Sequence, residues 1–478
     1  MALYEPSRLY TLREWIKANW LPNAYNTSGH TPASAPNSLF SAISSVSKLP
    51  VLETFLKDRT LVTGLLLTLI LVFITSYLKS PWRKLPPGPP RIPILGNMSQ
   101  LRNMKWLFST DCKGRFSEVM HLDAMGRQTI VFNSLKSAYN ILERRAGNYS
   151  GRPRFIMAQE ILNQGLGMAL MDYGELWRRL RRAAHDAVSR TTVQNYHPTQ
   201  TKEATILVSA LLDDPENRHS HFQRASASVI LSICDWWGSP EFQCIIIAKP
   251  RPLPLSDPEM MFLSGETYNQ SIAGFETTST TLMWWTFAMV AFPQVQRRAQ
   301  AELDAVVGRS RLPTFADAPH LPYVRAVIRE VLRWRPPIPS GVPHSATEDD
   351  WYEGMFIPKG AYADDFRPER HLGEGGELLP GPIETNQEGH VSFGFGRRIC
   401  VGKYLANDTL FISTARMLWA TTIESVMDEN GKEVVPDTDG FTDMGGFIHP
   451  IPYDCRIRPR FPEVVSTLSE ECERIRED

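Results

Sequence analysis

Cys400 lies in a loop whose composition suits a metal-bound thiolate. Residues 393–406 read FGFGRRICVGKYLA and place Cys400 between Gly396 and Gly402. A thiolate is a strong, soft ligand for iron, and it needs hydrogen-bond donors and positive charge around it. Both glycines can adopt backbone conformations that other residues resist, so we expect them to direct N–H groups toward the sulfur. The alternative is a buried and unreactive cysteine.

The neighbours of Cys400 support the same interpretation. Arg398 could pair with a carboxylate of a bound cofactor, and Phe393 can pack beside the ligand. The apolar run after Cys400 predicts a helix whose positive N-terminal end lies near the sulfur. These neighbours suit a thiolate ligand at Cys400, and the unreactive cysteine stays open as the alternative.

The loop resembles the haem-binding loop of the cytochrome P-450 monooxygenases. The match rests on five positions within ten residues: Phe393, Gly396, Arg398, Cys400 and Gly402. The resemblance implies that Cys400 is the axial ligand of a haem b iron, where the thiolate favours O–O cleavage. It also implies a mainly α (α+β) fold, helical with small β-sheets, of the eukaryotic, fungal, membrane-anchored type.

Residues 271–280, SIAGFETTST, are similar to the oxygen-activation helix of that family. Gly274 lacks a Cβ and would leave a notch for dioxygen above the iron. Glu276 and Thr277 place an acid beside an alcohol, which suits proton delivery, and the Thr277 hydroxyl can bond back to the Ala273 carbonyl. Taken alone, the segment could equally be a threonine-rich helix with no chemistry.

Two further segments resemble the family's partners of the haem propionates. Trp177 and Arg181 lie one helical turn apart in WRRLRRAAH, and His344 lies in GVPH. The other arginines of the first segment suit docking of an acidic electron donor, namely Arg178, Arg179 and Arg182. A basic surface helix is the alternative.

A structural triad is also implied by the resemblance. Glu330 and Arg333 in EVLR share one helix face at i, i+3, and Arg370 in FRPERHL is similar to the arginine that locks such a pair in the family. Its role would be support of the fold and of the haem loop. Without the resemblance, Glu330 and Arg333 would be an ordinary solvated ion pair.

The composition restricts the remaining classes of function. The chain has 478 residues, of which 42% are hydrophobic and 22% charged, as in globular proteins. A net charge of −1 gives no global basic character of the kind that binds nucleic acid. Six cysteines without a C-x-x-C pair argue against a zinc site or a disulfide framework.

The elements that position these residues are mostly helical over residues 101–335. Clear helices are predicted over 293–307, with Pro293 at the start and Gly308 after the end, and over 323–334. The final third is interrupted by glycine and proline and contains short β-like pieces such as Cys455–Ile457. A helical first part and a mixed tail predict the α+β class.

The N-terminal part predicts a membrane anchor. Residues 61–78 carry no charge and reach the short end of the length that spans a bilayer, while a buried core helix is the alternative. The basic residues that follow favour a cytoplasmic catalytic domain, so we expect a single-pass protein of the endoplasmic reticulum membrane. The other predicted boundaries are a poorly ordered extension (1–60), a basic, proline-rich hinge (79–92), the monooxygenase domain (93–462) and a charged tail (463–478).

The sequence departs from the family at two places, which we interpret as internal deletions. Only 35 residues separate Trp237 from Ala273, and five prolines there exclude the two long helices that roof the substrate pocket in the family. Only five residues separate Gly360 from Phe366, where the family has a strand. A missing roof would leave the distal side of the haem wetter.

The sequence therefore predicts a monooxygenase that inserts one oxygen atom of O2 into an apolar organic substrate. Electrons would come from NADPH through a separate reductase, because no G-x-G-x-x-G follows a predicted strand in this chain. Two alternatives stay open: a truncated haem-thiolate relative that makes no product, and a haem-thiolate isomerase or dehydratase. The acid–alcohol pair argues against the second.

Overall fold

The computed structural model describes residues 59–100, 115–163, 165, 167–236, 258–348, 350–356, 371–373, 375–444 and 446–477. The chain divides into two compact units, Met1–Ser80 and Pro81–Asp478.

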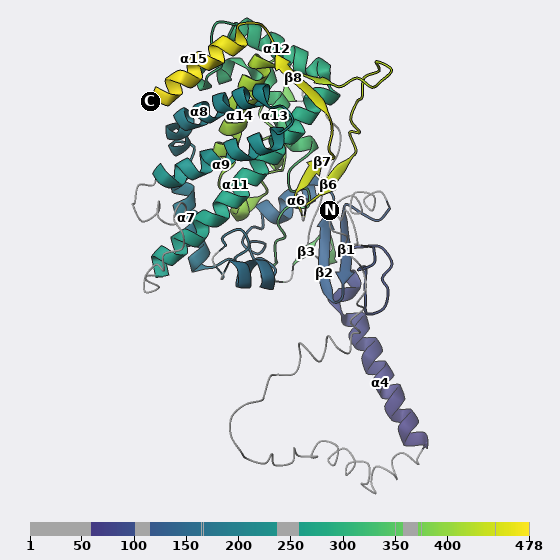
Figure 1. Cartoon of the computed structure of the whole chain (residues 1–478). Helices are drawn as coiled ribbons and strands as arrows, with labels where there is room; N and C mark the ends of the chain where they lie inside the picture. Colours follow the sequence, from purple (N-terminus) through teal and green to yellow (C-terminus); the bar gives the residue numbers. More distant parts are fainter. Residues whose placement is uncertain are drawn as a thin grey trace, which may run out of the picture. The chain divides into compact units, whose positions relative to one another are not determined.

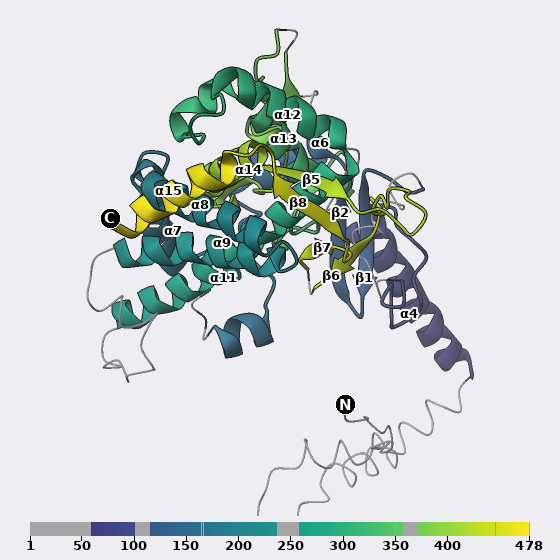
Figure 2. The same ribbon diagram turned by 45° about the horizontal axis from the view of Figure 1, so that its top comes forward.

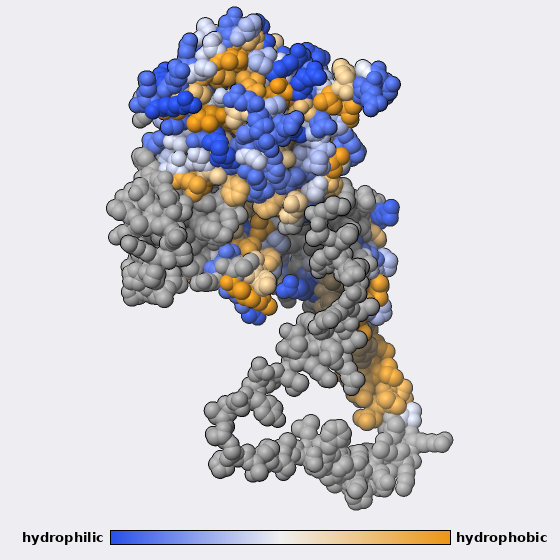
Figure 3. All heavy atoms as spheres, in the orientation of Figure 1, coloured by the Kyte–Doolittle hydropathy of each residue, from blue (hydrophilic) through white to orange (hydrophobic). Residues whose placement is uncertain are grey.

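In the first unit, helix α4 (Arg59–Lys79) covers the segment predicted as an anchor. Its apolar side chains are exposed, for example Leu66 and Phe73, and Figure 3 shows this helix in orange. Within the described ranges, however, no helix is both long and apolar enough to cross a bilayer. The predicted transmembrane anchor at residues 61–78 is therefore not supported.

The second unit is built mainly from helices, as predicted. They are α6 (Leu135–Ala138), α7 (Glu175–Ala187), α8 (His197–Asp213), α9 (Arg218–Trp236), α11 (Pro258–Ala291), α12 (Pro293–Val306), α13 (Pro322–Trp334), α14 (Lys403–Ala420) and α15 (Val464–Glu477). Short 3-10 or π segments join them: η1 (Pro81–Lys84), η2 (Tyr139–Glu143), η3 (Ile156–Leu162), η4 (Thr192–Tyr196), η5 (Phe315–His320), η7 (Ile383–Thr385) and η8 (Gly396–Arg398).

The predicted helix boundaries at α12 and α13 are confirmed to within one residue. Each helix begins with a proline, whose missing N–H costs nothing in the first turn. Gly308, with φ +76°, follows α12 and donates its N–H to the Leu303 carbonyl. This left-handed glycine ends the helix as the sequence predicts.

Each strand pairs with one other strand, and all pairs are antiparallel. The pairs are β1 (Val119–Ala124) with β2 (Arg127–Phe132), β3 (Trp351–Tyr352) with β4 (Met355–Phe356), β5 (Thr421–Ser425) with β8 (Cys455–Pro459), and β6 (Phe441–Asp443) with β7 (Ile448–Pro450). The predicted β-piece at Cys455–Ile457 is confirmed as part of β8. In Figures 1 and 2 the longer helices gather on one side of this unit and the strand pairs on the other.

Aromatic side chains fill the centre of the helical core. Trp284 on α11 meets Trp334 on α13 edge to face, with ring centroids 5.9 Å apart. Burying a side chain of this size contributes roughly 2–3 kcal/mol to folding. The Trp284 Nε1–H also donates to the Ile448 carbonyl at 2.9 Å, which fastens β7 to α11. The C-terminal segment joins the same core through Val464 and Leu468 of α15.

Candidate functional site

The loop before Cys400 is held in a conformation that only glycine tolerates at position 396. Gly396 has φ +58°, and a Cβ there would collide with the Leu142 carbonyl oxygen. Its N–H donates to the Glu143 carboxylate at 2.6 Å. The Cys400 N–H donates to the Phe393 carbonyl at 2.7 Å, so the loop closes on itself around the cysteine.

Gly402 differs from Gly396: its N–H is directed toward the Cys400 sulfur as predicted, but it does so without an unusual backbone conformation. Its φ of −85° is open to any residue, and a Cβ added at this position would meet no heavy atom within 4 Å. The glycine is therefore not required by the protein backbone. Helix α14 starts directly after it at Lys403, which confirms the predicted helix after Cys400.

Cys400 is an exposed residue, yet protein atoms crowd its sulfur. That crowding removes water and raises the pKa of the thiol, against the lowering effects of the Gly402 N–H and the Arg181 charge. The donors and charge that we predicted are present but do not outweigh desolvation. A metal ion would therefore have to displace the proton on binding, as is usual for thiolate ligands.

Three arginines surround this loop, and all of them donate to backbone carbonyls. Arg398 bonds to Ser150 at 2.8 Å, Met168 at 3.2 Å and Met171 at 2.8 Å. Arg181 bonds to the Ile399 carbonyl, next to Cys400. The third is Arg152, which bonds to three carbonyls: Ala169 at 2.8 Å, Val342 at 2.8 Å and Pro343 at 2.6 Å.

Carboxylates compensate these three positive charges only in part: Asp172 accepts from the Arg152 backbone N–H at 3.0 Å, and its charge acts on Arg398 without an ion-pair contact. Among the described residues, none of the three guanidinium groups has a carboxylate within ion-pair distance. Burial lowers the pKa of Arg152 to about 9 and that of Arg398 to about 10, and it also lowers the pKa of Arg181. Arg152 is buried while Arg181 and Arg398 are partly buried, and a charge that is removed from water without an ion partner is costly. The two carboxylates of a haem would supply the missing charge, so these residues fit the cofactor.

Trp177 contributes differently from the prediction. Its Nε1–H donates to the Met168 carbonyl at 3.2 Å, so this donor is engaged within the protein. Its ring instead lies under the Arg398 guanidinium, 4.4 Å from centroid to Cζ, in a cation–π contact. Trp177 therefore positions Arg398. The outward arginines of α7 are exposed as expected, and Arg178 pairs with Glu175 at 2.5 Å.

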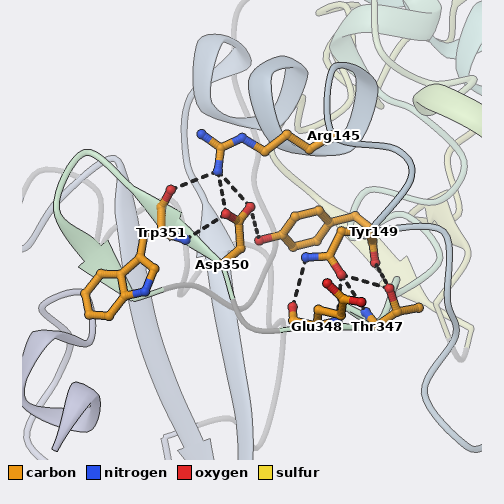
Figure 4. A network of polar contacts seen from close by, with 7 residues as sticks. Arg145, Tyr149, Thr347, Glu348, Asp350 and Trp351 are labelled. Atoms are coloured by element: carbon orange, nitrogen blue, oxygen red, sulfur yellow. Dashed lines mark hydrogen bonds and ion pairs between the residues drawn. The ribbon is translucent and has the colours of Figure 1, made fainter.

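A polar network holds the segment around Tyr149 against the segment from Thr347 to Trp351 (Figure 4). The Tyr149 hydroxyl donates to Asp350 at 2.9 Å, and Arg145 reaches the same carboxylate at 2.7 Å. His344 Nδ1 bonds to the Tyr149 carbonyl at 2.8 Å. The network fixes Ser150, whose carbonyl accepts from Arg398, and brings His344 into the same neighbourhood as the three arginines.

The predicted triad is seen in part, with an additional member. Glu330 is fully buried and accepts from Arg333 at 2.9 Å. Arg370 lies outside the described residues. His371, which was not predicted, contacts the Glu330 carboxylate through Nε2 at 2.9 Å.

On α11 the predicted hydrogen bond of Thr277 is confirmed, whereas the space predicted beside Gly274 is occupied by a protein side chain. The Thr277 hydroxyl donates to the Ala273 carbonyl at 2.7 Å. A Cβ on Gly274 would lie 2.8 Å from Cδ1 of Ile230 on α9. Ile230 fills the predicted notch, so the glycine lets α9 and α11 pack closely.

Glu276 faces a histidine from the C-terminal part of the chain. His449 Nε2 on β7 lies 3.2 Å from Glu276 Oε1, and Gln223 on α9 donates to Oε2 at 3.5 Å. Helix α11, which carries Glu276, packs on α14, the helix that follows Cys400.

Sequence reasoning missed three residues of these clusters: Arg152, His371 and His449. Their partners lie far away in the chain; Arg152 and Pro343, for example, are 191 residues apart. A weak signal existed for Arg152, which stands between Gly151 and Pro153 in a segment without a helical pattern.

The comparisons with known proteins agree with the geometry. The family model of the cytochromes P-450 matches residues 86–234, 243–362 and 361–441. Its interruptions, after residue 234 and near residue 361, fall next to the two predicted deletions.

Curated relatives come from fungi and are called cytochrome P-450 monooxygenases. One from Armillaria gallica is 38% identical over 86% of this chain and 96% of its own length. One from Postia placenta is 34% identical over 88% and 98%, and iboC from Amanita muscaria is 32% identical over 81% and 93%. These alignments span 506, 518 and 523 positions, more than the 478 residues of this chain, so the relatives contain segments that it lacks. The chain belongs to the cytochrome P-450 family of monooxygenases.

Proposed function

We propose that the protein binds haem b through Cys400 and oxidises a lipophilic small molecule with electrons that a reductase takes from NADPH. The observation that carries the proposal is the set of three arginines around the exposed residue Cys400. Arg152 is buried, Arg181 and Arg398 are partly buried, and within the described residues none of the three guanidinium groups forms an ion pair. Haem, when bound by a thiolate, supplies the chemistry of oxygen activation.

The protein's own residues would hold the cofactor at its two carboxylates. Arg152, Arg181 and Arg398 supply three positive charges, and His344 lies beside them. Guanidinium groups suit this task because their fork of donors matches a carboxylate. Trp177 keeps Arg398 in place through its ring.

Thr277 and Glu276 would move protons. Because the Thr277 hydroxyl hydrogen is engaged with the Ala273 carbonyl, its oxygen presents lone pairs to an incoming group. Glu276, the preceding residue, is the adjacent acid, and its side chain keeps 21% exposure to solvent. That exposure allows it to regain a proton from water.

The electron donor would dock on the exposed arginines of α7, with Arg179 and Arg182 among them. An acidic partner would be guided there by charge, and its association would weaken with salt. We also propose location at the endoplasmic reticulum membrane, which fractionation of expressing cells would test.

The carbon monoxide difference spectrum of the reduced protein tests the proposal. We expect the red-shifted Soret band of thiolate ligation, and we expect its loss in Cys400→Ala. Cys455→Ala, at a partly buried cysteine outside the loop, is the matched control. Absence of haem from the wild-type protein would refute the assignment.

A second candidate is a haem-binding relative that makes no product. Ile230 beside Gly274 and the interrupted family match favour it. Consumption of NADPH with a reductase separates the two candidates. In a working enzyme, Thr277→Ala should raise the peroxide formed per NADPH, whereas a defunct relative forms no product with any substrate.

A further inference from the structure

The Glu276 carboxylate is held by side chains that the sequence does not place near it. His449 Nε2 lies 3.2 Å from one oxygen and Gln223 Nε2 donates to the other at 3.5 Å. The same nitrogen of His449 lies 3.4 Å from the Thr280 hydroxyl, one turn along α11. A hydrogen bond from an N–H group to a carboxylate is charge-assisted and directional.

His449 is itself fixed in place. It is 7% exposed and sits on β7 opposite Thr442 of β6. On its N-terminal side, the Ile448 N–H donates to the Pro337 carbonyl at 3.0 Å, and the Ile448 carbonyl accepts from Trp284 at 2.9 Å. The imidazole is therefore carried on a backbone that is bonded to the core from two directions.

The groups that face this imidazole come from two helices. Glu276 and Thr280 belong to α11, and the exposed His219 on α9 meets the ring edge to face at a centroid distance of 5.7 Å. Burial lowers the pKa of His449, and the charge of Glu276 acts in the opposite direction. The contact between His449 Nε2 and Glu276 Oε1 therefore does not depend on a charged imidazole.

We propose that His449 is a positioning residue for proton delivery, which orients the Glu276 carboxylate beside Thr277. This rests on the proposed function. A glutamate side chain has several rotatable bonds, and holding one oxygen fixes the direction of the other. A small displacement of the acid changes the rate of proton transfer strongly.

Four variants of the full-length, haem-loaded protein test the proposal by the peroxide formed per NADPH. We expect Glu276→Gln and His449→Leu each to raise this ratio on the order of tenfold, a fraction of what general acid catalysis supplies. His449→Gln keeps an N–H donor and should restore most of the coupling. The double variant His449→Leu/Glu276→Gln should show the same ratio as Glu276→Gln, because both changes remove the same interaction. His320→Gln, at an exposed histidine, is the control.

The outcomes distinguish the role of His449 from the proton route through Glu276. If Glu276→Gln raises the ratio and His449→Leu does not, the role of His449 is refuted while the monooxygenase stands. If Glu276→Gln has no effect, the proton route through Glu276 fails, and the role of His449 fails with it.

A second measurement needs no turnover. In protein labelled at the histidine ring carbons, the NMR signal of His449 is identified by its loss in His449→Gln. Its titration midpoint should move to lower pH in Glu276→Gln, because the carboxylate no longer favours the protonated ring. An unchanged midpoint would show that the two groups are not coupled in solution.

Discussion

His390 should make the folded protein sensitive to mild acid. The side chain is 3% exposed, and its Nδ1 accepts from the Ser392 N–H at 3.3 Å. Within the described part of the chain, Nε2 has no hydrogen-bond partner. Burial, reinforced by the charge of Arg329, lowers the pKa of this histidine from 6.5 to about 3.

The sign of the effect follows from proton uptake. Below about pH 6.5 an unfolded histidine binds a proton, whereas the folded His390 stays neutral. The free energy of unfolding therefore falls as the pH falls. At pH 5.0 the pH is about 1.5 units below the pKa of the unfolded histidine, whereas at pH 7.5 it is above that pKa. Protonation therefore stabilises the unfolded state by about 2 kcal/mol on going from pH 7.5 to pH 5.0, and the folded protein loses the same amount of stability.

The assay compares urea unfolding at the two pH values for the wild type and for His390→Asn. Asparagine can still accept from Ser392 but does not titrate, so this variant should lose about 2 kcal/mol less than the wild type on acidification. The comparison cancels the other titrating groups. His320→Asn, at an exposed histidine, should behave as the wild type. Equal losses in the wild type and His390→Asn would show that His390 is not held neutral by burial.

Three further changes have defined expectations. Gly396→Ala should destabilise the protein by about 2 kcal/mol or more in urea unfolding, because its positive φ and the Leu142 carbonyl oppose a Cβ; Gly147→Ala, with open space around it, should not. Glu330→Gln should cost about 3 kcal/mol in the same assay, since it leaves the charge of Arg333 without its buried partner, whereas exposed Glu429→Gln should be neutral. Arg152→Gln should release haem to apomyoglobin about tenfold faster, since it removes one of the three charges that would face the cofactor. Arg154→Gln, at an exposed arginine paired with Glu160, is the control. Equal rates of haem release in the wild type and Arg152→Gln would exclude Arg152 from haem binding.

The fold was predictable where local signals were strong. Proline and glycine mark the ends of α12, and both survive in the structure as the first residue of the helix and the left-handed residue after it. The Cys400 loop was predictable for a similar reason, because its pattern is compact and specific. Such features depend on neighbours in the sequence.

Properties that depend on distant contacts could not be predicted. Gly396 and Gly402 look equivalent in the sequence, but only Gly396 meets a carbonyl from η2. An open notch was expected beside Gly274, and the side chain of Ile230 from another helix lies there instead. The engagement of the Trp177 donor by Met168 likewise follows from tertiary packing.

The arginine contacts around Cys400 also determine when this site can assemble. Arg398 and Ser150 are 248 residues apart, and Glu143 and Gly396 are 253 apart. A growing chain that has emerged only through α13 contains Arg152 and Arg181 but lacks the loop that completes their surroundings. Contacts of such long separation are closed late, because chain entropy opposes them until other parts have packed. We therefore expect the surroundings of Cys400 to be complete for haem binding only after these long-range contacts have closed.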